Sequence, residues 1–241
     1  MFIDSTIEFL VSWAWNSDSP ILLKSNLAHY KPRKVFAGAC FSGILTVDGK
    51  LLTFGLGASG QLGHLDNEGN CYGFMYIPKR VDALDDYFIG DVSFGEAHAL
   101  VIARKKIKSE EDPRGYYLGD QREVFAWGVN AKGQWGFKLG GSSCLPKKID
   151  AFSEYNVIQV SAGKKHSLFV AEKDGVTALY ACGDASKGAW GLTKSLSGIF
   201  KEPQQVKILE KHRKMNDVTK KANIVAIEAG YLSSFAIIES D

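Results

Sequence analysis

Short apolar runs separated by turn residues make up most of the chain. Residues 43–47 form one such run, which ends at Asp48-Gly49, a dipeptide typical of a tight hairpin, and residues 50–54 form the next. Residues 168–181 repeat this arrangement around Asp174-Gly175. Both runs of each pair are short and largely apolar, as expected of strands that are covered on both faces. The pattern therefore predicts sheets of short antiparallel strands.

A glycine-rich turn follows each hairpin, and it recurs along the chain. Its copies occupy residues 54–63, 127–136 and 182–191, and a worn copy lies at 13–19. Glycine suits a tightly folded backbone that a neighbouring segment approaches closely. We therefore expect an architectural role for the glycines that the copies share, namely Gly55, Gly63, Gly128, Gly136, Gly183 and Gly191.

A second motif precedes each turn and contains an anchoring glycine. The four anchoring glycines are spaced 57, 68 and 67 residues apart, and they are Gly38, Gly95, Gly163 and Gly230. His98 and His166 follow the second and third of them at the same distance. Because function usually lies where a repeated fold loses its symmetry, we predict that both histidines make a structural hydrogen bond.

A third motif begins with proline and ends three residues later with valine or isoleucine. Its copies start at Pro32, Pro78, Pro146 and Pro203. Three motifs that recur in one order indicate a repeat protein. Each unit reads as a sheet of about four strands, which is the blade of a β-propeller.

The pattern resembles the regulator of chromosome condensation repeat family. The resemblance rests on the A-G-x-x-H-S stretch, the D-G hairpin, the W-G-x-N-x-x-G-Q-x-G turn and the P-x-x-V segment, and it covers nearly the whole chain. It implies an all-β propeller, usually of seven blades. The family's founding member exchanges nucleotide on the small GTPase Ran and docks on chromatin, and many other members are scaffolds or ubiquitin-ligase modules.

This chain carries only about four repeats. It opens with the second half of a unit, about residues 10–30, and closes with the first half of another. We predict a single domain over residues 1–241, in which the two half-repeats join into one blade and close a small ring. Such closure removes exposed strand edges. An open arc and a part of a seven-bladed ring are the alternatives.

Two segments interrupt the repeat. Residues 104–123 replace the short turn of the second hairpin, and residues 204–223 carry six basic against two acidic residues, with apolar residues at helical spacing. Inserted loops on a rigid propeller are where partners bind, although idle, solvated loops are the alternative. The candidate partner-binding residues are Arg104, Lys105, Lys106, Asp112, Arg114, Tyr116, Tyr117, Lys211, Arg213 and Lys214.

Composition limits the cellular compartments and the classes of partner that we expect for this chain. With 29 Lys and Arg against 27 Asp and Glu, the net charge of +2 does not argue for nucleic acid. No apolar run is long enough for a membrane span, and the acidic residues near the start speak against a signal peptide. The cysteines lack C-x-x-C spacing, so we expect free thiols and an intracellular protein, cytoplasmic or nuclear; they are Cys40, Cys71, Cys144 and Cys182.

The sequence offers no catalytic, cofactor-binding or metal-binding constellation. The glycine-rich turn does not end in the Gly-Lys-Ser/Thr of a phosphate loop, and no Cys/His cluster has zinc spacing. We therefore predict a non-enzymatic scaffold that presents propeller-face loops to a protein partner, for instance as a subunit of a larger assembly. The first alternative is a guanine-nucleotide exchange factor for a Ran-like small GTPase. The second is a chromatin or nucleic-acid binding module, which the basic segment 204–223 supports.

Overall fold

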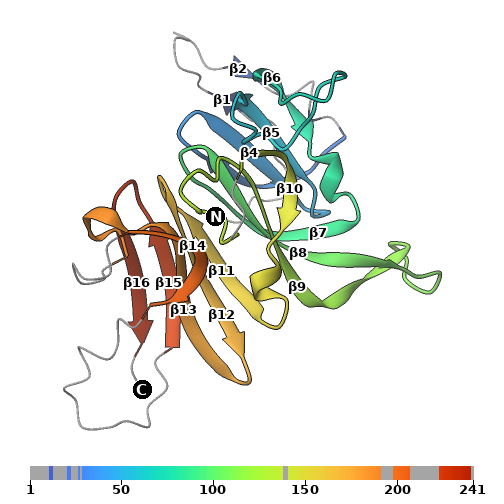
Figure 1. Ribbon diagram of the computed structural model, residues 1–241. Helices are drawn as coiled ribbons and strands as arrows, with labels where there is room; N and C mark the ends of the chain where they lie inside the picture. Colours follow the sequence, from blue (N-terminus) through green and yellow to red (C-terminus); the bar gives the residue numbers. More distant parts are fainter. Residues whose placement is uncertain are drawn as a thin grey trace.

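The protein is built almost entirely of antiparallel β-sheets. A computed structural model describes residues 11–12, 21–22, 27, 29–137, 141–190, 198–206 and 223–239. Within these residues, three sheets have four strands and two sheets have two strands (Figure 1). We call the four-stranded sheets blades 1, 2 and 3, and the two-stranded sheets the N-terminal and C-terminal half-blades. The predicted all-β architecture of four-stranded units is confirmed.

The strands of each blade follow one another in chain order. A short 3-10 turn leads from blade 1 into blade 2 (η2, Asp82–Leu84) and from blade 2 into blade 3 (η3, Asp150–Phe152), and η4 (Ser186–Gly188) lies in the third glycine-rich turn. The N-terminal half-blade contains β1 (Val11–Ser12) and β2 (Ile21–Leu22). Blade 1 contains β3 (Pro32–Ala37), β4 (Phe41–Thr46), β5 (Leu51–Leu56) and β6 (Phe74–Arg80). Blade 2 contains β7 (Tyr87–Phe94), β8 (His98–Lys108), β9 (Tyr116–Gly128) and β10 (Ser143–Lys148). Blade 3 contains β11 (Asn156–Ala162), β12 (His166–Lys173), β13 (Val176–Asp184) and β14 (Ile199–Gln205). The C-terminal half-blade contains β15 (Asn223–Ala229) and β16 (Ser234–Glu239).

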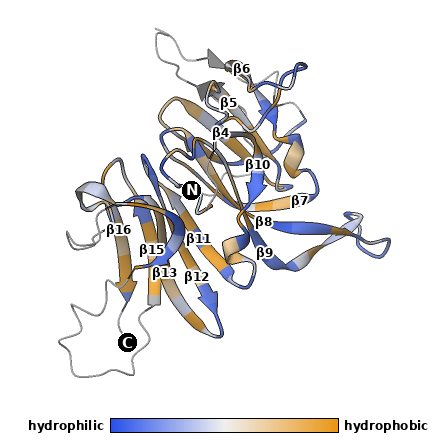
Figure 2. Ribbon diagram, in the orientation of Figure 1, coloured by the Kyte–Doolittle hydropathy of each residue, from blue (hydrophilic) through white to orange (hydrophobic). Residues whose placement is uncertain are grey.

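The hydrophobic core lies between the blades rather than within them. Leu45 of blade 1 packs with Val92 of blade 2, Leu100 of blade 2 packs with Phe169 of blade 3, and Leu168 of blade 3 packs with the C-terminal half-blade. The central strands are covered on both faces, as their apolar runs predict, and Figure 2 shows hydrophobic stretches along them. Each blade is therefore stable only because its neighbours cover it.

The blades follow one another along an open arc, so the predicted closure by the two half-repeats is not confirmed. Among the described strands, β16 pairs only with β15, and β1 pairs only with β2. Figure 1 shows the two half-blades at opposite ends of the arc. The packing at each seam fixes the rotation from one blade to the next, and this number of blades does not complete a circle. The described blades lie in an arc, and both alternatives from the sequence, an open arc and a part of a seven-bladed ring, stay predictions.

The third sequence motif was aligned wrongly at its first copy. Pro78, Pro146 and Pro203 lie in β6, β10 and β14, the fourth strand of each blade. Pro32 instead begins β3, a first strand. Pro32 precedes its anchoring glycine by only 6 residues, whereas Pro78 and Pro146 precede theirs by 17. The residue types of the motif are present at Pro32, but its distance from the anchoring glycine differs from that of the other copies.

The expectation of four free thiols is also wrong. Cys71 and Cys144 form a disulfide with their Cα atoms 5.2 Å apart, whereas Cys40 and Cys182 are free. The two bonded residues are 73 positions apart and belong to blades 1 and 2. They meet because the loop after the first glycine-rich turn reaches the start of β10. Sequence spacing does not reveal a contact made by blade stacking.

The glycines of the turns are required by backbone conformation and by close approach between blades. Gly60 has φ +85°, and a Cβ added there would lie 2.6 Å from the carbonyl oxygen of Ser143 in blade 2. Gly188 occupies the equivalent place in the third turn with φ +76°, and a Cβ there would meet nothing within 4 Å. The two positions therefore separate the cost of left-handed backbone from the cost of a seam clash.

We predict that Gly60→Ala destabilises the protein more than Gly188→Ala. Left-handed backbone costs a non-glycine residue about 1–2 kcal/mol, and both variants carry this cost. Overpacking against the backbone of Ser143 adds about 1–3 kcal/mol for Gly60→Ala alone. Urea unfolding of both variants measures the difference. Equal free energies of unfolding would show that the close approach at this seam carries no stability.

Candidate functional site

His98 and His166 lie at the seams between blades and make the same hydrogen bond. His98 Nε2 lies 3.0 Å from the hydroxyl of Ser167 in the next blade, and His166 Nε2 lies 3.0 Å from the hydroxyl of Ser234. Each serine hydroxyl donates to a turn carbonyl of the preceding blade. Because the serine proton is used there, each histidine donates its Nε2–H to the serine. Both imidazoles are buried and hold blades together, which is a structural role.

The seam between blades 1 and 2 replaces this polar pair with aromatic packing. Phe41 occupies the place of the histidine, and Ala99 occupies the place of the serine. The ring centroid of Phe41 lies 4.6 Å from that of Phe94. The turn carbonyl, here of Gln61, accepts a hydrogen bond of 2.9 Å from Trp127 Nε1 instead. Because the histidine and the serine of the other seams are both replaced here, neither residue leaves a buried polar group without a hydrogen-bond partner.

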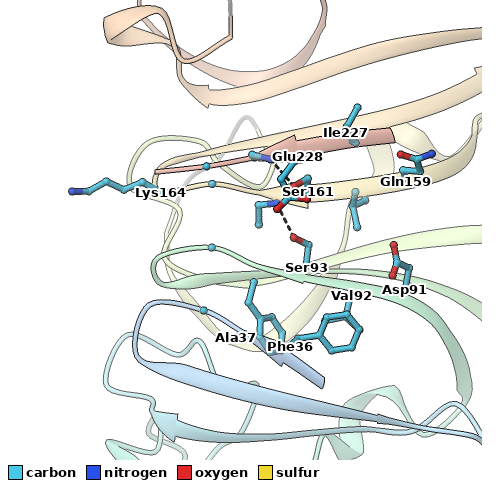
Figure 3. A pocket seen from close by; sticks show the side chains of 18 of the residues that line it. Phe36, Ala37, Asp91, Val92, Ser93, Gln159, Ser161, Lys164, Ile227 and Glu228 are labelled. Carbon is cyan, nitrogen blue, oxygen red and sulfur yellow. Dashed lines mark hydrogen bonds between the residues drawn. The ribbon is translucent and has the colours of Figure 1, made fainter. Parts of the chain in front are cut away.

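A groove of about 700 Å³ lies on the inner side of the arc (Figure 3). The first strands β3, β7, β11 and β15 line it. Two serines in the groove join neighbouring strands: Ser93 accepts a hydrogen bond of 2.9 Å from the backbone N–H of Ala162, and Ser161 accepts one of 2.8 Å from Ala229. Sequence reasoning did not identify this groove, because only the stacking of blades brings these strand residues to one surface.

Four charged residues at the groove form two ion pairs. Lys164 lies 3.5 Å from the carboxylate of Glu96, and its ammonium group lies 3.8 Å from the ring centroid of Tyr231. Lys34 lies 3.4 Å from the carboxylate of Asp91. Exposed ion pairs of this kind contribute little stability. Because each of these charges has a partner, they do not by themselves select an ionic ligand.

Residues 104–123, expected as an inserted loop, continue strands β8 and β9 into a long hairpin, which we call the arm. Pairing extends to Lys108 opposite Tyr116, and Figure 1 shows the arm projecting from blade 2. Arg104 Nε donates a hydrogen bond of 2.7 Å to the carbonyl of Gly119 across the arm. The strands therefore carry an ordered projection beyond the blade.

The base of the arm is tied to blade 2 by a lysine. Lys106 Nζ donates a hydrogen bond of 3.1 Å to the carbonyl of Asp85, which follows η2. Burial, followed by the charge of Lys50, lowers the pKa of Lys106. Lys105, the remaining predicted residue on this strand, is exposed. Of the predicted basic residues here, Arg104 and Lys106 support the arm, while Lys105 faces solvent.

The arm has two chemically different faces. Ile107 and Tyr117 are cross-strand partners, so they share one face, and both are exposed. On the other face, Lys106 and Arg114 each lie 5.4 Å from the ring centroid of Tyr116. The sequence analysis named Tyr116 and Tyr117 as a pair but missed Ile107. Its alternation with Lys106 and Lys108 was the available signal, once the segment is read as a strand.

The tip of the arm is held by its own contacts. Asp112 and Arg114 form an ion pair of 2.7 Å, and the side-chain hydrogen bond from Arg114 lowers the pKa of Asp112 to about 2. The backbone N–H of Gly115 donates a hydrogen bond of 2.7 Å to the carbonyl of Asp112. Asp112 and Arg114 thus shape the turn that joins the two strands.

The remaining sequence candidates lie outside the described residues. These are Lys211, Arg213 and Lys214, together with the expected helix around them and Gly191. Within the described ranges, no three His, Cys, Asp or Glu side chains are grouped to hold a metal ion. In the same ranges, no helix has the length and apolar character that crossing a lipid bilayer requires.

Comparison with known proteins identifies the repeat. The profile of the regulator of chromosome condensation (RCC1) repeat family matches residues 48–102 and 123–170. Both matched stretches are RCC1 repeats. The two matches stop and resume at the arm, so residues 103–122 lie outside the RCC1 repeat pattern. The arm is therefore an addition to the family's blade.

RCC1-repeat relatives are longer than this chain. The ultraviolet-B receptor UVR8 of Arabidopsis thaliana is 28% identical over 156 residues, which is 65% of this chain and 30% of the receptor. The RCC1-like G exchanging factor-like protein of Mus musculus is 27% identical over 190 residues, 72% of this chain and 36% of the relative. The crystal structure of Prp20p from Saccharomyces cerevisiae superposes with a TM-score of 0.62 and 20% identity, covering 92% of this chain and 45% of Prp20p. The chain thus spans less than half of each of these proteins.

We predict that protonation of buried histidine makes the fold less stable below pH 6.5. Burial, with a smaller contribution from the charge of His166, lowers the pKa of His98 from 6.5 to about 3. Folded His98 therefore stays neutral while the unfolded chain binds a proton, so stability is full above pH 6.5 and falls as the pH approaches 3. At pH 5 this single residue lowers the free energy of unfolding by about 2 kcal/mol relative to pH 8.

The double variant His98→Phe, Ser167→Ala isolates this effect because it copies the pair that the first seam already carries. Urea unfolding at pH 8 and pH 5 should show about 2 kcal/mol less pH dependence for the double variant than for wild type. Ser167→Ala alone keeps the histidine and should retain the wild-type dependence. An unchanged dependence in the double variant would contradict the assignment to His98.

Proposed function

We propose that this RCC1-repeat protein is a non-enzymatic scaffold that binds a protein partner through the arm. The observation that carries the proposal is an ordered hairpin that extends beyond the repeat pattern and exposes Ile107 and Tyr117 side by side. Apolar and tyrosine side chains that stand exposed together are typical of interaction sites. A rigid propeller with one enlarged connection is a common way to position such a site.

The chemistry of the arm indicates the kind of partner surface it fits. Ile107 and Tyr117 require an apolar pocket, because their exposed area must be removed from water to contribute affinity. The opposite face carries Lys106 and Arg114 over Tyr116, and Lys108 pairs with Tyr116 across the strands. Positive charge beside an aromatic ring favours carboxylates at the rim of the contact. We therefore propose a partner with an apolar pocket bordered by acidic residues.

The arm should be tested by site-specific photo-crosslinking followed by affinity measurement. A photo-crosslinking amino acid at position 117 should join one discrete partner in native lysate, and the same group at Val176, the exposed end of the blade 3 hairpin, should not. Affinity for the identified partner should then fall at least about tenfold in the double variant Ile107→Ser, Tyr117→Ser, since hot-spot truncation costs 1.4 kcal/mol or more. Val176→Ser provides the matched control. Equal crosslinking at both positions, or unchanged affinity, would refute the proposal.

A second candidate function is guanine-nucleotide exchange on a Ran-like small GTPase. The observation that favours it is the similarity to the mouse protein named as an RCC1-like G exchanging factor-like protein. Exchange requires only that a protein wedge stabilise the nucleotide-free GTPase, so it needs no catalytic triad of its own. The arm is the projection on this chain that could act as such a wedge.

Exchange activity is distinguished from simple binding by turnover. Fluorescent nucleotide release from a panel of small GTPases should accelerate at substoichiometric amounts of this protein if it is an exchange factor. The double variant Ile107→Ser, Tyr117→Ser should lower that rate at least about tenfold if the arm is the wedge. If no GTPase responds to wild-type protein while the arm still crosslinks to a partner, the scaffold remains and the exchange function is excluded.

A further inference from the structure

A pocket of about 340 Å³ lies at the seam between blades 2 and 3 and shares no residue with the groove. The second glycine-rich turn, η3 and strands β13 and β14 contribute to its walls. Four aromatic and two acidic side chains line it, namely Phe137, Phe152, Tyr155, Tyr180, Asp150 and Glu202. Gly136, Ala151 and Pro203 complete the described lining, which therefore contains no basic residue. Aromatic rings and carboxylates that share a pocket suit a cation.

Three of the aromatic rings stand nearly perpendicular to one another. The ring plane of Phe152 is inclined by 86° to that of Tyr155 and by 83° to that of Tyr180, and the two tyrosine rings are inclined by 75°. These edge-to-face contacts hold the rings in a corner. Both tyrosines are half-buried, so part of each side chain remains accessible. A corner that is already ordered costs a ligand little in immobilised side chains.

The corner is fixed to the body of the seam. The ring centroid of Phe152 lies 4.8 Å from that of Phe169, which belongs to the buried core between blades 2 and 3. Burial, followed by a side-chain hydrogen bond with Tyr155, raises the pKa of Tyr180 to about 12. Tyr180 therefore stays protonated at neutral pH and keeps this bond. The two tyrosines thus present neutral aromatic surfaces of defined position.

The chain itself places a cation on one ring of the corner. Lys173 Nζ lies 5.2 Å from the ring centroid of Tyr155, and it also donates a hydrogen bond to the carboxylate of Glu154. Lys173 is not among the residues that line the pocket. Tyr155 thus already combines with a positive charge and a carboxylate beside the pocket, and the pocket offers the same two components.

The seam between blades 1 and 2 differs at most of the equivalent positions. The residues that replace Phe137, Phe152, Tyr180 and Glu202 there are His64, Leu84, Phe125 and Leu145, respectively.

The polar groups that this first seam retains bind one another. Tyr87, the equivalent of Tyr155, donates a hydrogen bond of 3.3 Å to Glu123, and Asp82, the equivalent of Asp150, forms an ion pair of 2.9 Å with Arg80. The set of rings and carboxylates at the second seam is therefore a departure from the repeat. Function usually lies at such departures.

We propose that this pocket binds a quaternary ammonium group, such as that of choline or of a trimethylated lysine side chain. Such a cation spreads its charge over methyl groups and has no N–H donor, so aromatic faces can replace its water without leaving a donor unsatisfied. A primary ammonium ion is strongly hydrated and gives up hydrogen bonds to water against ring faces. Asp150 and Glu202 add a negative potential that attracts the cation. The site is separate from the arm and does not depend on the scaffold function.

Isothermal titration calorimetry with two matched pairs of ligands tests the proposal. The first pair is choline and its neutral analogue, in which carbon replaces the quaternary nitrogen. The second pair is a short peptide with trimethyllysine and the same peptide with unmodified lysine. At least one cation should bind about fivefold or more tightly than its counterpart. Choline binding indicates a small metabolite as the source, and binding of the trimethyllysine peptide alone indicates a modified protein. No binding by either cation, or equal binding within both pairs, would overturn the proposal.

Variants at the two seams separate recognition from folding. Tyr155→Leu should weaken binding of the cation about fivefold or more, whereas Tyr87→Leu, the matched change at the first seam, should leave it unchanged. The double variant Asp150→Asn, Glu202→Gln alters exposed side chains, so its circular dichroism should match that of wild type. It should weaken binding of the cation about threefold or more and leave binding of the neutral analogue as it is. Unchanged affinity in Tyr155→Leu or in the double variant, or an equal loss in Tyr87→Leu, would contradict the assignment.

Discussion

Apolar packing between neighbouring blades is the interaction on which the rest of this structure depends. A four-stranded sheet whose central strands are apolar on both faces is not stable in water alone, and stacking against the next sheet removes both faces from solvent. Leu45, Leu100 and Leu168 lie in the cores of three successive seams. The arc, the groove on its inner side and the position of the arm all follow from how these seams stack.

The polar groups at the seams vary while the apolar packing is retained, because different side chains can donate the hydrogen bond that each turn carbonyl needs. A turn carbonyl faces the next blade at each seam and needs a donor, since an unpaired buried carbonyl is costly. Trp127 donates to it at the first seam, Ser167 at the second and Ser234 at the third. Histidine accompanies serine at the last two seams but is replaced by Phe41 at the first. The repeated histidines therefore belong to the architecture.

Specific recognition has to come from features that differ from one blade to the next. Among the hairpins that the structure describes, that of blade 2 alone carries the arm, and the arm combines an exposed apolar face with a cationic and aromatic face. The Cys71–Cys144 disulfide likewise joins blades 1 and 2, the pair whose seam lacks the histidine–serine bond. The ends of the arc differ from its interior because Val35, Phe235 and Ile237 remain exposed. The features that differ from one blade to the next thus lie in separate parts of one repeated scaffold.

The sequence by itself determined the repeating unit. Short apolar runs, the Asp48-Gly49 hairpin and the recurring glycine-rich turns predict four-stranded blades, because strand length and turn conformation are local properties. The insertion at residues 104–123 was identified in the same way, because it interrupts the local repeat pattern. The sequence also carried the periodicity that places Ile107 beside Tyr117, although reading the segment as a loop concealed it.

Only the tertiary structure decided how the units are placed relative to one another. Three features depend on contacts between residues far apart in the chain: the arrangement of the described blades in an arc, the pairing of Cys71 with Cys144, and the position of Pro32 in a first strand. The angle between blades results from the packing of many side chains across each seam, and no local motif encodes it. Exposure of Val35 and Ile237 is decided in the same way, since equivalent residues are buried wherever a neighbouring blade covers them.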